Sequence, residues 1–257
     1  MKPEIKNKSP YFNKLEKIEF VVTYACTGRC KHCSEGDHKS CGEYIKPEFA
    51  ARAVRELTSA YPIRTVMAFG GEPLLYPEAV YAIMRAALEC GVPRRQLITN
   101  GFFSKEQSRI EAVARMLAEC GVNDLLLSVD AFHQETIPLT IVKEFARAAR
   151  GFGIPVRLSP AWLVSLADDN PYNRRTREIL DSFADVDVTV GDGNFVFPEG
   201  NAIKHLAEYF EKNAPKNPYT QNPCEIKCLS IEPDGSLLDQ NINLKDVIKI
   251  LEEYTPC

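Results

Sequence analysis

The sequence of 257 residues lacks any uninterrupted apolar run that is long enough to span a bilayer. It also lacks a polycationic stripe, because its net charge is −4 and its basic residues are dispersed, so a phosphate-backbone partner is not expected. The N-terminal stretch 1–15 is polar and Lys-rich, without the apolar core of a targeting segment. No low-complexity tract or repeat is present. We therefore expect a cytoplasmic protein with no nucleic-acid and no membrane partner.

The cysteines do not resemble a disulfide framework, because there are nine of them and three are clustered. Cys26, Cys30 and Cys33 form a CxxxCxxC triplet directly after a short apolar run, and therefore in the loop that leaves a first strand. The triplet supplies three thiolates, one fewer than a closed structural zinc site or an all-cysteine iron–sulfur cluster requires. On these residues alone, two other interpretations stay open: a zinc knuckle completed by Cys41 or His38, or three unrelated thiols.

Short β-rich apolar runs alternate with helical patterns along most of the chain. The runs are Ile18–Thr23, Thr65–Phe69, Gln96–Thr99, Leu125–Val129, Pro155–Ser159 and Val186–Val190. The segments between them show a period of about 3.6 residues, and Ser104 with Gln107 predicts a capping box that opens the third helix. Apolar strands joined by helices indicate a parallel sheet with right-handed crossovers. We predict an α/β fold: a partial (β/α)6 TIM-like barrel over 1–200, with a small C-terminal hairpin-plus-helix extension over 201–257.

The residues that follow the strands should line the catalytic edge, since chemistry in parallel barrels gathers at the C-terminal strand ends. The second run leads into Phe69-Gly70-Gly71-Glu72-Pro73, in which two glycines allow a close backbone approach. The third run ends in Thr99-Asn100-Gly101 and the fourth in Ser128-Val129-Asp130. By themselves these endings are also ordinary turn and helix-cap signals.

The cysteine triplet and the Gly-Gly-Glu-Pro segment, one strand–helix unit apart, resemble the motifs of the radical S-adenosylmethionine (SAM) superfamily. In that family, three cysteines at this spacing hold three irons of a [4Fe–4S] cluster and SAM chelates the fourth. The resemblance therefore implies that Cys26, Cys30 and Cys33 are the metal ligands. His32 occupies the position where the family usually has an aromatic residue, and we count it among the cofactor-binding candidates.

The same resemblance implies where SAM binds. The glycine-rich segment would hold the amino group of its methionine part, and the polar ends of the next strands would contact its ribose and carboxylate. The cofactor-binding candidates are His32, Gly70, Gly71, Glu72, Pro73, Asn100, Ser128, Asp130 and Ser159.

Other polar residues of these loops match no general family motif that we can place. Our hypothesis is that they face the substrate, and an ordinary solvated loop is the alternative. They include Glu35 and His38 after the cysteines, and residues 133–135 after the fourth strand. We select His133 and Cys41 as catalytic candidates. For His133, a hydrogen-bonded structural histidine is the alternative.

The C-terminal tail, which follows the segment 198–202, resembles a shortened form of the extension of SPASM and twitch radical SAM enzymes, in which cysteines flank a hairpin and bind auxiliary clusters. Residues 233–235, Pro-Asp-Gly between apolar runs, predict its turn. The SPASM pattern commonly has a cysteine five positions after the hairpin glycine, where this chain has Gln240. We therefore expect no complete auxiliary cluster. The remaining candidate thiols are Cys224, Cys228 and Cys257.

The function implied by the resemblance is that of a radical SAM enzyme. An external one-electron reductant such as flavodoxin or ferredoxin would reduce the cluster, and SAM would be cleaved to a 5′-deoxyadenosyl radical that abstracts hydrogen from the substrate. The shortened tail favours a ribosomal peptide or a protein side chain as that substrate. A small metabolite is the alternative, and a non-catalytic zinc-binding scaffold is a third interpretation.

Overall fold

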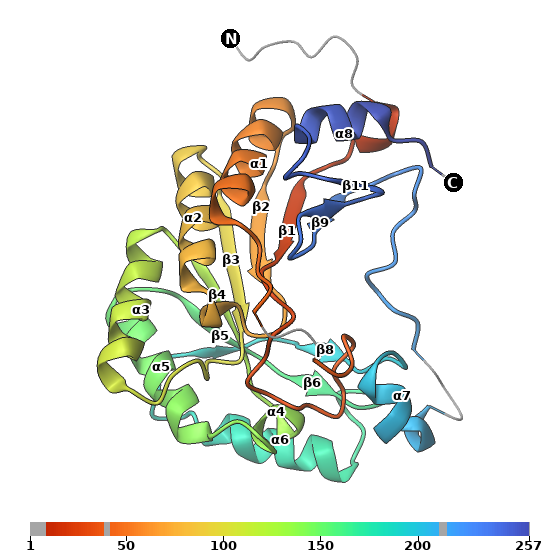
Figure 1. Ribbon diagram of the computed structural model, residues 1–257. Helices are drawn as coiled ribbons and strands as arrows, with labels where there is room; N and C mark the ends of the chain where they lie inside the picture. Colours follow the sequence, from red (N-terminus) through yellow and green to blue (C-terminus); the bar gives the residue numbers. More distant parts are fainter. Residues whose placement is uncertain (1–8, 39–41, 211–214, 257) are drawn as a thin grey trace.

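The computed structural model describes residues 9–38, 42–210 and 215–256 (Figure 1). In these residues the central sheet has seven strands, all parallel, in the order β7-β5-β4-β3-β2-β1-β9. The strands are β1 (Lys17–Val21), β2 (Thr65–Phe69), β3 (Arg94–Thr99), β4 (Asp124–Ser128), β5 (Val156–Ser159), β7 (Thr189–Val190) and β9 (Cys228–Ile231). The prediction of an α/β partial barrel is confirmed, with one more strand than the sequence indicated.

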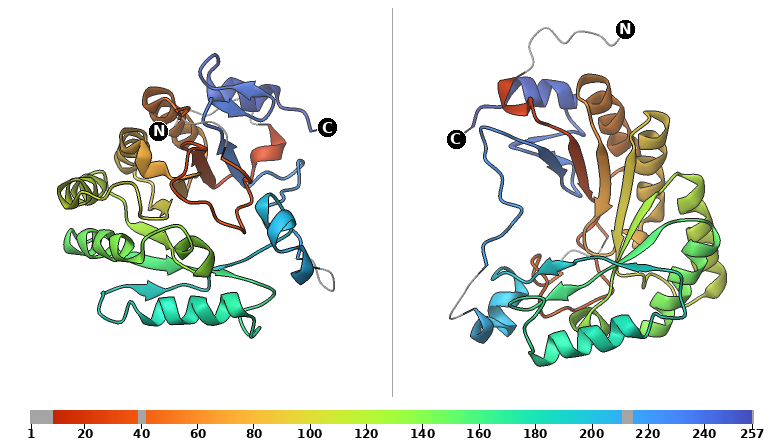
Figure 2. Two further views of the ribbon diagram at one scale, coloured as in Figure 1. Left: turned by 60° about the horizontal axis from the view of Figure 1, so that its bottom comes forward. Right: turned by 180° about the vertical axis from the view of Figure 1, so that it is seen from behind.

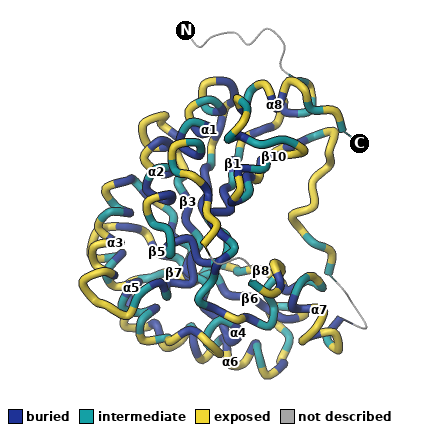
Figure 3. Tube along the Cα trace, in the orientation of Figure 1, coloured by how far each residue is buried: buried dark blue, intermediate teal, exposed yellow. Residues whose placement is uncertain are grey.

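Helices cover the convex face of this sheet, and the opposite face is concave (Figure 1). The longer helices are α1 (Pro47–Ala60), α2 (Pro77–Glu89), α3 (Gln107–Glu119), α5 (Leu139–Gly151), α6 (Pro171–Asp181) and α8 (Val247–Glu253). Successive side chains of a strand point to opposite faces. Ile18 and Phe20 of β1 and Val66 of β2 are accordingly fully buried against the helices, whereas the intervening Glu19 is only partly buried. Figure 3 shows the same contrast between buried strands and exposed outer helix surfaces.

Shorter elements surround the loop that follows β1, which we call the cysteine loop (residues 22–38). They are α4 (Ala131–Gln134), β6 (Ala161–Trp162), β8 (Asn194–Phe195) and α7 (Asn201–His205), with the 3-10 helices η2 (Pro73–Leu75) and η3 (Ala207–Tyr209). A third 3-10 helix, η1 (Pro10–Phe12), lies at the other end of the sheet beside α8, where the ring of Phe12 packs against that of Tyr254 (Figure 1). Strands β6 and β8 pair in parallel as a small separate sheet. The cysteine loop lies among α4, α7, β6 and β8 in Figure 1, at the end of the barrel where the β-strands terminate.

The C-terminal tail completes the sheet, which the sequence did not predict. Strand β9 pairs in parallel with β1, from Lys17↔Cys228 to Phe20↔Ile231, and the return strand β10 (Ser236–Leu237) pairs with β11 (Gln240–Asn241). The turn at 233–235 does form, since Gly235 N donates to Glu232 O at 2.9 Å. Strand β9 joins β1 because the unpaired edge of β1 offers backbone partners, and because alternate β9 side chains extend the main core.

The segment 215–223 connects the two sides of the barrel, running from the region of β8 to β9 (Figure 2). Tyr219 Oη donates to Asn194 Oδ1 at 2.9 Å, and Gln221 Nε2 donates to Cys228 O at 2.9 Å. These two contacts anchor the segment beside β8 and beside β9. In the described ranges, we find no helix that combines the length and the apolar character that a bilayer crossing requires.

Two local predictions were wrong. Helix α3 begins at Gln107 without a side-chain cap, because Ser104 Oγ accepts the N–H of Glu106 at 3.1 Å in a turn before the helix. The sixth run forms a strand only at Thr189–Val190. The N–H groups of Val186 and Val188 instead close local turns onto the carbonyls of residues 183 and 186, so they are not free to pair with β5.

Candidate functional site

The cysteine loop places three thiols beside one another. Cys30 is buried, and Cys26 and Cys33 are partly buried. A Cβ atom added to Gly28 would lie 3.3 Å from Cys30 Sγ and 3.7 Å from Cys26 Sγ, so the missing side chain leaves space next to both sulfurs. Burial raises the pKa of Cys26 to about 11 and also raises the pKa values of Cys30 and Cys33. The thiols are therefore protonated at neutral pH, and a metal that binds them must displace protons.

The glycine pair after β2 holds the stem of the cysteine loop. Gly71 N donates to Thr23 O at 2.7 Å, and Glu72 N donates to Ala25 O at 2.8 Å. A Cβ atom on Gly71 would lie 2.2 Å from Ala25 O, and Gly70 has a φ of 133°. The close approach that the sequence predicted is thus made to the backbone of the cysteine loop itself, and a side chain at Gly71 would push this loop away.

The start of α7 holds the other end of the loop. Asn201 N donates to Cys33 O at 2.9 Å, and Asn201 Nδ2 donates to Cys30 O at 3.3 Å. A Cβ atom on Gly200 would lie 2.4 Å from Cys33 O, and this glycine has a φ of 54°. From the sequence, the segment 198–202 was expected only to mark the end of the barrel before the tail. Its Gly-Asn pair carried a signal for a close backbone approach, but not for its distant partner.

Glu72 is fully buried and joins β2 to β3. Its carboxylate accepts hydrogen bonds from Leu74 N at 2.9 Å, Thr99 Oγ1 at 2.7 Å and Asn100 N at 2.9 Å. Burial raises its pKa to about 7, against the effect of these donors. Both oxygens of Glu72 are therefore engaged by the protein, and they fix the strand end that carries Asn100. Pro73, the next residue, begins η2 and is also buried.

Asn100 reaches from the end of β3 to the cysteine loop. Its Nδ2 lies 3.5 Å from Cys26 Sγ and 3.2 Å from Thr27 Oγ1, and its Oδ1 accepts the N–H of Phe102 at 2.8 Å. The polar atoms of the Asn100 side chain are thus all in contact with protein groups.

Asp130, at the end of β4, is fully buried and holds α4 and β6 together. Its Oδ1 accepts the N–H groups of Phe132 and His133 at 2.9 Å, and its Oδ2 accepts the N–H of Ala161 at 3.0 Å. Burial by itself would raise the pKa of Asp130, but the charge and the hydrogen bond of His133 lower it to about 2. His133 Nδ1 lies 2.8 Å from Asp130 Oδ2, so the carboxylate also orients the imidazole ring.

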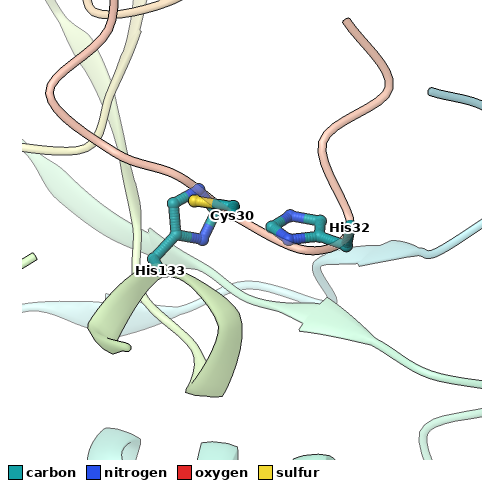
Figure 4. A group of neighbouring side chains, drawn as sticks. All are labelled: Cys30, His32 and His133. Carbon is teal, nitrogen blue, oxygen red and sulfur yellow. The ribbon is translucent and has the colours of Figure 1, made fainter. Parts of the chain in front are cut away.

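Cys30, His32 and His133 converge next to one another (Figure 4). One potential ligand atom from each lies within 4.8 Å of the others. The ring of His32 packs against the rings of His133 and Phe132, each at 4.8 Å between centroids. His32 Nδ1 is buried without a hydrogen-bond partner in the described part of the chain, and burial lowers its pKa to about 4. His32 is therefore neutral at physiological pH.

Three of the remaining candidates can be placed from their contacts. Ser128 and Ser159 are neighbours across β4 and β5, at the carboxyl ends of these strands. His38 Nε2 lies 3.8 Å from Cys33 Sγ. Cys41 lies outside the described residues, so its predicted role stays a prediction.

One contact of the cysteine loop was not expected from the sequence. The hydroxyl of Tyr24, in the cysteine loop, donates to the carboxylate of Glu232, which directly follows β9. No local pattern could have indicated this pair, because it depends on the docking of β9 against β1.

Together, a parallel partial barrel, a CxxxCxxC loop after its first strand and a Gly-Gly pair against the stem of that loop define a radical SAM enzyme. Residues 20–161, more than half of the chain, match the radical SAM superfamily, and the chain belongs to this superfamily. Its cofactors are accordingly a [4Fe–4S] cluster and SAM. The donor set fits such a cluster, since three thiols leave one iron open and Gly28 leaves room beside two of the sulfurs.

Known proteins similar to this chain support the same fold. It is 25% identical over 130 residues to a GTP 3′,8-cyclase of Microcystis aeruginosa, a match that covers 48% of this chain but only 37% of that protein. The structure resembles Streptococcus suis SuiB bound to S-adenosylmethionine, with a TM-score of 0.60, 12% identity, and coverage of 95% of this chain and 67% of SuiB. It also resembles anSMEcpe with bound AdoMet, with a TM-score of 0.58, 15% identity, and coverage of 93% and 80%.

Proposed function

We propose that this radical SAM enzyme abstracts a hydrogen atom from a ribosomal peptide or a protein side chain. The observation that carries the proposal is the open sheet: in the described residues, the edge strands β7 and β9 do not pair with each other. An open barrel can admit an extended chain along its concave face. Structures of similar fold support this choice, since SuiB was solved with its precursor peptide SuiA and anSMEcpe with the Cp18Cys peptide.

In this proposal, Cys26, Cys30 and Cys33 hold three irons, and SAM occupies the fourth. When bound, the cluster and SAM supply an electron and a 5′-deoxyadenosyl radical, after an external reductant such as flavodoxin or ferredoxin has delivered that electron. The three thiols must stay reduced to bind iron, so we also propose a cytoplasmic setting.

SAM would lie across the strand ends, from the turn at 70–73 to the hydroxyls of Ser128 and Ser159. Glu72 and Asp130 would act on SAM through the loops that they hold, because their carboxylates already accept several protein donors. His133 would present its Nε2 side to the reaction centre, since Asp130 engages its Nδ1.

We further propose that the tail, residues 201–257, is a shortened SPASM-like extension without a complete auxiliary cluster. The position where the SPASM pattern has a cysteine is Gln240, whose side chain instead bonds Lys245 Nζ at 2.8 Å and Glu253 at 3.3 Å. Cys224 is exposed and Cys228 is partly buried. Cys257 lies outside the described residues.

Deuterium transfer tests the function most directly. The anaerobically reconstituted protein is mixed with SAM, a reductant and candidate substrates that carry deuterium, and 5′-deoxyadenosine is analysed by mass spectrometry. We expect deuterium in 5′-deoxyadenosine with a peptide substrate. Transfer only from a small molecule would contradict the peptide proposal and favour the metabolite alternative, to which the sequence match with GTP 3′,8-cyclase points.

A further inference from the structure

The side-chain amide of Asn100 is well placed to hydrogen-bond a cluster ligand. Its Nδ2 lies 3.5 Å from Cys26 Sγ and 3.2 Å from Thr27 Oγ1, and the residue is only 4% exposed. A primary amide carries two N–H groups. One of them can therefore donate to the sulfur while the other donates to the threonine hydroxyl.

The orientation of this amide is fixed by its neighbours. Oδ1 of Asn100 accepts the backbone N–H of Phe102 at 2.8 Å, so a flipped amide would place two donors against each other. The backbone N–H of Asn100 donates to Glu72 Oε2 at 2.9 Å, and Glu72 is itself held by Thr99 and Leu74. The NH₂ group of Asn100 is therefore directed at the cysteine loop by contacts that involve no cofactor.

Cys26 accepts hydrogen bonds from two different parts of the chain. The backbone N–H of Gly28 lies 3.3 Å from Cys26 Sγ, which is a contact within the cysteine loop. The donor from Asn100 comes from the end of β3, and it is the one that a side-chain substitution can remove.

We propose that Asn100 is a positioning residue that sets the reduction potential of the cluster by donating an N–H···S hydrogen bond to the Cys26 thiolate. Hydrogen bonds to ligand sulfurs stabilise the more negative, reduced state of an iron–sulfur cluster and so raise its potential. This role goes beyond the proposed function, because it concerns the cluster sulfur and not SAM, and it holds for any substrate.

The test is an EPR-monitored redox titration of the reconstituted holoenzyme without SAM. Asn100→Asp keeps the oxygen that accepts the N–H of Phe102, but replaces the NH₂ donor with an oxygen. Asn100→Leu removes both the oxygen and the NH₂ group, and the leucine side chain has a similar volume. We expect both variants to shift the midpoint potential to more negative values, with the larger shift for Asn100→Asp because of its added negative charge.

The matched control is Asn123→Asp. The side-chain amide of Asn123 also makes two hydrogen bonds to the backbone: its Oδ1 accepts the N–H of Arg95 at 2.8 Å, and its Nδ2 donates to Pro93 O at 2.8 Å. These bonds lie at the opposite end of β3. We expect the midpoint potential of the cluster in Asn123→Asp to equal that of the wild type. A wild-type potential in Asn100→Asp would overturn the proposal.

A second measurement applies if the Asn100 variants fail to hold a cluster. In the wild-type holoenzyme, asparagine is labelled selectively with a nitrogen isotope, and the reduced cluster is examined by pulsed EPR. We expect a magnetic coupling between the cluster and the labelled side-chain nitrogen. The absence of this coupling would overturn the proposal independently of any variant.

Discussion

Gly71→Ala should detach the cysteine loop from the barrel, although it adds a single methyl group. The new Cβ would lie 2.2 Å from Ala25 O, a separation that cannot be relieved by rotating a side chain because the obstacle is backbone. The hydrogen bonds Gly71 N to Thr23 O and Glu72 N to Ala25 O would be strained as the two backbones separate. Overpacking costs about 1–3 kcal/mol and each weakened hydrogen bond about 0.5–1.5 kcal/mol, so we expect a loss of about 2–6 kcal/mol in unfolding free energy.

The assay is chemical denaturation of the metal-free protein, followed by iron and sulfide analysis after anaerobic reconstitution. Two glycines provide matched controls, because a Cβ atom at either Gly91 or Gly151 would meet nothing within 4 Å. Gly91 has a φ of 70°, so Gly91→Ala should cost only backbone strain of about 1 kcal/mol. Gly151→Ala should be nearly neutral. If Gly71→Ala unfolds like the wild type and still binds about four irons, the steric argument is refuted.

Three further predictions concern the metal and the buried carboxylate. Replacing the three cysteines of the cysteine loop with alanine should abolish iron binding there and SAM cleavage; a cluster that still forms would contradict the ligand assignment. Reconstituted wild-type protein should hold about four irons per chain; about eight, falling to four in a Cys224→Ser/Cys228→Ser variant, would reveal an auxiliary cluster. Asp130→Asn should lose about 2–3 kcal/mol of unfolding free energy at neutral pH. Folding lowers the pKa of Asp130 to about 2. The difference in unfolding free energy between wild type and Asp130→Asn should therefore shrink as the pH falls from about 4 towards 2, and a difference that stays constant over this range would contradict the prediction.

The sequence predicted the parts of the site that depend on local pattern. The runs 65–69 and 96–99 are strands because their side chains are apolar on the helix-facing side, and the loops after them meet at one edge because parallel strands end together. The spacing of the three cysteines indicated a metal site, because all three thiols belong to one loop and are close together in the sequence. The expected close approach at Gly71 was also real, although its partner proved to be Ala25.

The contacts that the sequence could not predict join segments that are far apart in the chain. Nothing near residues 228–231 indicates pairing with β1, because an edge strand accepts any strand of suitable shape. The hold of Asn201 on Cys30 and Cys33 likewise depends on how the tail returns to the barrel. Asp130 is a third example. Its position after a strand predicted a contact with a ligand, but only the folded structure shows that its carboxylate already accepts several hydrogen bonds from the protein.

The pairing of β9 with β1 has a consequence for biosynthesis. Strand β1, which carries the cysteine loop, has β2 as a neighbour early in translation, but its other edge stays unpaired until residues 228–231 leave the ribosome. A nascent chain shorter than this exposes an open sheet edge beside three thiols, and such an edge can pair with other chains. Contacts between residues so distant in sequence also form slowly. We therefore expect iron delivery to follow the docking of β9, so that the metal enters a loop whose supporting strand already has both of its neighbours.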